Sequence, residues 1–159
     1  MRAACELRVD LMRPKGRDYV KRSGFIIASA LFVVSVVGSG QAQKTVWDGV
    51  YTEEQAKRGA ELYAEKCSMC HGDSLGGVES APALTGPAFY GNWEGETLNA
   101  LFERIRLSMP QDNPGSLSRT QNADIIAHML RVGGYPAGNT ALEGQAGALT
   151  AIKVLTYKP

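Results

Sequence analysis

The sequence predicts one small all-α domain of about four helices, on the basis of its size and of the spacing of its apolar residues. The chain has 159 residues, of which 44% are apolar and 21% charged, so it can build one hydrophobic core but not two. Apolar side chains recur at helical intervals in separate stretches after residue 50. We place the globular domain at residues 43–138, between an N-terminal leader and a C-terminal tail.

Residues 1–42 have the organisation of a secretory leader. A cluster of Lys and Arg between residues 13 and 22 precedes the apolar run GFIIASALFVVSVVG, and small residues near Ala42 suit cleavage. A comfortable membrane span would need about 18 to 20 apolar residues. We therefore expect a cleaved signal peptide and a periplasmic or otherwise exported protein, with an uncleaved membrane anchor as the alternative. Both Met1 and Met12 are candidate start sites, and Cys5 leaves with the leader.

The charge of the remaining chain argues against one class of partner. Residues 43–159 carry ten basic and thirteen acidic side chains, so the globular part is mildly acidic. Nucleic-acid binding needs a basic face that displaces counterions from phosphates, and the sequence has no basic patch of that kind in the domain. We expect no nucleic-acid partner.

The first helix is expected to begin at Thr52 and to run into Cys67. Thr52 followed by Gln55 resembles a capping box. Small and aromatic side chains share one helical stripe, at Ala56, Ala60, Tyr63 and Ala64. Gly59 costs about 1 kcal/mol relative to Ala, so we expect a close helix crossing at this position that offsets the cost.

Two further long helices follow a loop rich in Gly, Pro and Ser. This loop, residues 72–87, is expected to lack regular structure. Helical periodicity resumes in residues 97–107. The last long helix is expected to start at Ser118, with Gln121 three residues later, and to end near Gly133.

The stretch CSMCH at residues 67–71 places two thiols beside an imidazole. A disulfide between Cys67 and Cys70 would close a very small loop and would stabilise the fold only weakly. A thioredoxin-like pair needs a strand before its cysteines, whereas the residues before Cys67 are helical in pattern. A structural zinc site needs four ligands, and only His71 and the distant His128 are available to complete it. Each of these interpretations lacks a part.

Covalent haem attachment accounts for the whole motif. Cysteines at i and i+3 form thioethers to the two vinyl groups of a porphyrin, while the adjacent His71 reaches the iron. Met109, in a loop punctuated by Pro and Gly, is the candidate for the sixth position of the iron. Met129 lies on the apolar face of the last helix, which predicts core packing for it. His128 is expected on the helix surface or partly buried, and it is a poor ligand candidate.

From about Val50 to Gly138 the chain resembles a class I c-type cytochrome, a mono-haem family with His/Met ligation. The matching stretches occur in the family's order: a helix ahead of CSMCHG, then APALTGPAFYGNW, then SMP, then LSRTQNADIIAHML. The resemblance implies a cytochrome c-like fold of about four helices wrapped around one covalently attached haem c per chain. It places the thioethers and the two iron ligands on Cys67, Cys70, His71 and Met109.

The resemblance also implies roles around the haem. The carbonyl of Pro82, with Pro87 as its rival, would accept a hydrogen bond from the ligating imidazole and so fix its orientation. Trp93 would lie against the haem, although a plain core tryptophan has the same pattern. In one departure from the family, His128 stands where the closing helix usually carries an aromatic residue.

The function implied is one-electron transfer without chemistry on a substrate, so we expect an electron carrier and not an enzyme. The expected partners are a periplasmic dehydrogenase as donor and a terminal oxidase or another cytochrome as acceptor. Service as the haem subunit of a quinoprotein dehydrogenase complex is a narrower form of this hypothesis. The alternatives are a haem enzyme or gas-binding protein with an open sixth position, and a non-haem redox or zinc module.

The tail, residues 139–159, has a different pattern. Its last part alternates between apolar and polar residues and would suit one short strand, but no partner strand is evident. We expect the tail to wrap along the domain, with partial disorder of its Gly-rich part as the alternative.

Overall fold

The computed structural model describes residues 43–79 and 81–159, so the predicted leader lies outside the described residues. The described chain is mostly helical, which confirms the all-α class. Its regular elements, in chain order, are β1 (Lys44–Thr45), α1 (Glu53–Lys66), α2 (Ser68–His71), α3 (Gly86–Gly91), α4 (Leu98–Ser108), α5 (Arg119–Val132), α6 (Ala146–Thr150) and β2 (Ile152–Lys153). Within these two ranges, none of the helices combines the length and hydropathy that a membrane crossing requires.

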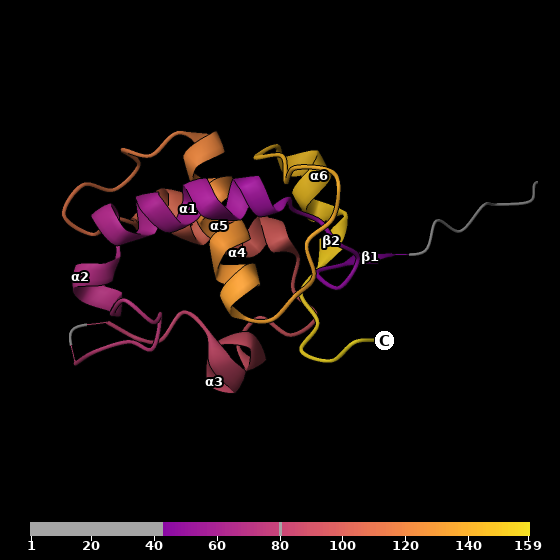
Figure 1. Ribbon diagram of the computed structural model, residues 1–159, viewed down its shortest axis with the longest axis horizontal. Coiled ribbons are helices and arrows are strands. Elements are labelled where there is room, and N and C mark those ends of the chain that lie inside the picture. Colours follow the sequence, from indigo (N-terminus) through magenta and orange to yellow (C-terminus); the bar gives the residue numbers. More distant parts are fainter. Residues whose placement is uncertain (1–42, 80) are drawn as a thin grey trace, which may run out of the picture. The chain divides into compact units, whose positions relative to one another are not determined.

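The three long helices are the predicted ones, and α1 and α5 pack side by side (Figure 1). A Cβ on Gly59 would overlap the backbone carbonyl of Asp124, which confirms the predicted close crossing. The guanidinium of Arg58 joins the same helices through two 3.0 Å hydrogen bonds to the Asp124 carboxylate. The ring of His128 lies 5.3 Å from that of Tyr63 between centroids, so the histidine occupies this interface as an aromatic residue would.

Both predicted capping signals start a helix, but they differ in detail. Ser118 and Gln121 form a complete capping box at the start of α5. At α1 the Thr52 hydroxyl accepts a hydrogen bond from the Gln55 backbone N–H, yet the Gln55 side chain does not return to Thr52. It pairs instead with the backbone of Leu142, donating to the carbonyl at 2.9 Å and accepting from the N–H at 2.7 Å. The second half of the predicted box was wrong because the tail offers Gln55 two partners.

The tail packs against the domain and includes α6 and β2. Its buried side chains are Leu142, Leu149, Ile152 and Val154. β2 runs parallel to β1, with Lys44 opposite Ile152. The partner strand was not evident in the sequence because it is only two residues long. The structure also contains short helices that the sequence did not predict. One of them, α3, begins at Gly86, inside the end of the loop that was predicted to be irregular.

Candidate functional site

The CSMCH motif forms a separate turn of helix, α2, that follows directly from α1. Cys67 ends α1 and starts α2, and its carbonyl accepts hydrogen bonds from the N–H groups of Cys70 at 3.1 Å and His71 at 2.9 Å. Cys67 is half-buried, Cys70 is exposed and His71 is buried. The two thiols and the imidazole therefore come from one helical turn, as a motif with this spacing requires.

The imidazole of His71 is held by the backbone of a loop that follows it. Its Nδ1 lies 2.8 Å from the carbonyl oxygen of Pro82, and because a carbonyl only accepts, Nδ1 carries the proton and donates. This is the hydrogen bond that the resemblance assigns to a proline. Pro87, the rival, lies instead in the first turn of α3. The tautomer leaves Nε2 as the nitrogen that is free to bind a metal.

The loop that follows His71, residues 72–79 and 81–84, is also hydrogen-bonded to the backbone of His71. The N–H of Gly77 donates to the carbonyl of His71 at 2.9 Å. Gly77 has a φ of +77°, and a Cβ there would press against the backbone of Ala83. Glycine is needed for both reasons, and the close approach brings the Pro82 segment to His71.

Tyr63 connects this loop to α1. Its hydroxyl donates a hydrogen bond of 2.6 Å to the carbonyl of Gly72, the residue after His71. Burial, with smaller contributions from Cys67 and Asp73, raises the pKa of Tyr63 to about 12, so the hydroxyl remains a donor at neutral pH. The sequence places Tyr63 on the buried stripe of the helix, but nothing in the sequence signals its hydrogen bond.

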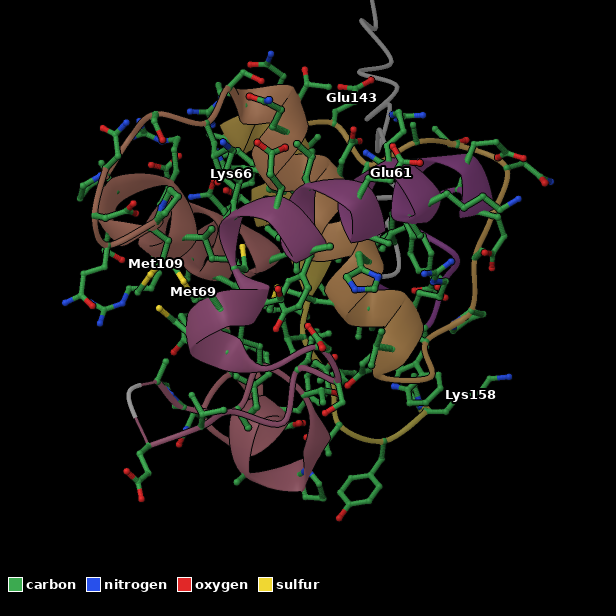
Figure 2. The ribbon with its side chains drawn as sticks, turned by 60° about the vertical axis from the view of Figure 1, so that its left-hand side comes forward. Glu61, Lys66, Met69, Met109, Glu143 and Lys158 are labelled. Atoms are coloured by element: carbon green, nitrogen blue, oxygen red, sulfur yellow. The ribbon has the colours of Figure 1, made fainter. Side chains whose placement is uncertain are left out.

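Met109 lies at the end of α4, where the chain enters a loop. Its N–H closes the helix on the carbonyl of Ile105 at 2.8 Å, and its backbone then becomes extended. Figure 2 shows Met109 and Met69 on the same side of the view, beside α2. Met129, by contrast, is 1% exposed, which confirms the prediction that it packs in the core.

Trp93 lies just after α3 and packs partly buried against the core. Its ring is 6.3 Å from that of Phe89 between centroids, and its backbone N–H donates to the carbonyl of Tyr90 at 3.0 Å. Phe89 in turn contacts Tyr90 edge to face. The tryptophan thus belongs to an aromatic cluster of the protein itself, and its contact with a haem stays a prediction.

The surroundings of the thiols differ from those of a redox-active pair. Among the residues that the structure describes, no group of three or more His, Cys, Asp and Glu side chains is placed to hold a metal ion. Burial, with the nearby Cys70, raises the pKa of Cys67 to about 11, whereas catalytic cysteines have a lowered pKa. Helix α1, not a strand, precedes Cys67. The raised pKa of Cys67 and the helix before it disfavour the thioredoxin-like interpretation.

Three large apolar side chains are exposed in the segments that carry the candidate site residues, and no signal in the sequence marks them. Met69, between the two cysteines, is 90% exposed; Val78, in the loop that returns to His71, is 50% exposed; and Leu107, just before Met109, is 62% exposed. Met69 lies inside the motif and Val78 follows Gly77, which is bonded to His71, so these two side chains leave apolar surface at the motif that a ligand or partner can cover. Together with the free Nε2 of His71 and the two thiols, they fit the attachment of a flat, apolar, iron-bearing group.

A match to a cytochrome family agrees with this chemistry. Residues 54–129 match the family described as cytochrome C oxidase, cbb3-type, subunit III. The thiosulfate dehydrogenase of Stutzerimonas stutzeri (strain A1501) is 32% identical over 78 residues, which are 45% of this chain and 25% of that relative. The chain therefore spans about a quarter of the relative it matches. The crystal structure of the sulfane dehydrogenase SoxCD from Paracoccus pantotrophus superposes with a TM-score of 0.48 at 20% identity, covering 73% of this chain and 68% of that one.

Proposed function

We propose that this protein carries one electron on a single haem c, because residues 54–129 match a cytochrome family and c-type cytochromes bind haem covalently and transfer electrons. In this proposal Cys67 and Cys70 would form the thioethers, and His71 and Met109 would hold the iron. Haem supplies the couple between Fe(III) and Fe(II). The residues of the chain attach it, orient the imidazole and close the sixth position.

The hydrogen bond between His71 Nδ1 and the Pro82 carbonyl, at 2.8 Å, is the observation that carries the proposal. A metal-bound histidine almost always donates its other ring N–H to an oxygen acceptor, which fixes the ring and raises its basicity. A thioether from Met109 on the opposite side would raise the potential and leave no position for a substrate. Both effects suit electron transfer better than catalysis at the iron.

The proposed partners are a periplasmic dehydrogenase as donor and a terminal oxidase or another cytochrome as acceptor. A partner would meet the exposed edge of the haem through a small contact, of the kind that transient redox complexes use. The basic and apolar leader supports export to the periplasm, where c-type redox partners would meet the protein. An uncleaved leader would add a membrane anchor.

One observation favours a narrower setting. The relative from Stutzerimonas stutzeri is named as a thiosulfate dehydrogenase. This name favours, as electron donor, an enzyme that oxidises reduced sulfur compounds over a quinoprotein dehydrogenase. We propose that the chain accepts electrons from such an enzyme and does not oxidise the sulfur compound itself. Thiosulfate alone should then leave the oxidised haem spectrum unchanged. Rapid conversion to the reduced spectrum would instead assign the enzymatic activity to this chain.

The role of Met109 separates an electron carrier from a haem enzyme or gas-binding protein. Met109→Ala should abolish the long-wavelength absorption of the sulfur-to-iron bond and should open the reduced haem to carbon monoxide. Leu107→Ala is the matched control, because Leu107 is an apolar residue in the last turn of the helix that ends at Met109 and its side chain is 62% exposed. If wild-type protein binds carbon monoxide as readily as Met109→Ala, the sixth position is open and the electron-carrier proposal fails.

A further inference from the structure

Tyr63 lies outside the CSMCH motif, yet it is joined to the loop that orients His71. Within residues 43–79 and 81–159, its hydrogen bond to Gly72 is the only one that links residues 72–84 to any residue before Cys67 or after Leu84. The other hydrogen bonds of this loop stay inside the segment from Cys67 to Leu84. The position of the loop relative to α1 therefore depends on this hydroxyl more than on any other polar group among the described residues.

The hydroxyl is itself held in a rigid place. Tyr63 is 2% exposed, and its ring packs against His128 of α5 at a centroid distance of 5.3 Å. The two helices approach closely at Gly59, one turn away, where a side chain would overlap Asp124. Tyr63 thus connects the close helix crossing at Gly59 to the residue that follows His71.

We propose that Tyr63 is a positioning residue for the haem ligand His71, an inference that rests on the proposed function. By holding the Gly72 carbonyl, the hydroxyl fixes the end of α2 and the start of the loop. Both ends of the hydrogen bond between His71 Nδ1 and Pro82 depend on that placement. A well-formed bond makes the imidazole more basic, which favours Fe(III) and lowers the reduction potential.

The test compares two tyrosines that make the same kind of bond. Tyr63→Phe removes the hydroxyl and keeps the ring, so the potential of the purified holoprotein should rise and the ring N–H of His71 should exchange faster. Tyr51→Phe is the matched control, because the buried Tyr51 hydroxyl donates to the carbonyl of Tyr135 at 2.7 Å, away from the loop. This control should keep the wild-type potential.

The outcomes separate this inference from the proposed function. A potential for Tyr63→Phe equal to that of wild type, or an equal rise in Tyr51→Phe, overturns the positioning role while leaving a working electron carrier. A wild-type protein without covalent haem overturns both proposals. If Tyr63→Phe does not retain haem, His128→Leu decides instead: it removes the ring behind Tyr63 and should raise the potential by a smaller amount, and an unchanged potential contradicts the role.

Discussion

The two ends of helix α1 differ in how far the protein completes them. At the N-terminal end, Gln55 pairs with both backbone groups of Leu142, and the short strands bury Ile152. At the C-terminal end, α2 leaves the Met69 side chain exposed, and the exposed thiol of Cys70 is not in a disulfide. Figure 1 shows β1 and β2 at one end of the helix pair and α2 at the other. The first end is completed by contacts within the protein, whereas in our proposal the haem covers the second.

The largest effect on this contrast is expected from removing both thiols. Cys67→Ser combined with Cys70→Ser should abolish covalent haem completely, as measured by haem staining after denaturing electrophoresis. Hydrogen exchange in residues 72–84 should then become faster, while β1 and β2 keep their protection. Colour that survives denaturation in the double variant, or an equal loss of protection at both ends, would contradict the comparison.

A smaller effect is expected at the opposite end. Gln55→Ala leaves the buried N–H and carbonyl of Leu142 without partners, so the free energy of unfolding should fall by about 2 to 3 kcal/mol, measured by urea titration. The haem spectrum should not change. Gln121→Ala is the matched control, since it removes only a cap interaction and should cost about 1 kcal/mol. A spectral change in Gln55→Ala would show that the two ends are not independent.

The smallest effect is a dependence of stability on pH, and it arises at His128, where α5 packs against α1. Burial, with the nearby Arg131, lowers the pKa of His128 from its ordinary value of 6.5. The unfolded chain therefore takes up this proton first, and the free energy of unfolding falls as the pH drops below 6.5, until the folded form is protonated too. His128→Phe should keep the ring packing and flatten this dependence, measured by urea titrations at about pH 7 and about pH 5. An unchanged slope in the variant would refute the assignment.

The sequence was a good guide to local features and a poor one to contacts between distant segments. Ser118 and Gln121 predicted the start of α5, because both residues lie at the start of that helix. Gly59 predicted a close helix crossing, because a glycine inside a helix needs a compensating contact, but it did not identify Asp124 as the partner. The pairing of Gln55 with Leu142 joins residues far apart in the chain, and a glutamine near a helix start has a local explanation that competes with it. The hydroxyl of Tyr63 is a similar case, since an aromatic residue on a buried stripe needs no polar partner to explain it.

Mass spectrometry of the tryptic peptide that begins at Cys67 tests the central claim most directly, namely that the incomplete end of α1 is finished by a haem bonded to the protein. Trypsin cleaves after Lys66, so both cysteines and His71 fall in one fragment of the exported protein. We predict a peptide whose mass is increased by that of one haem, with both thiols blocked to alkylation. A bare peptide with two free thiols, or one joined only by a disulfide, would contradict the account.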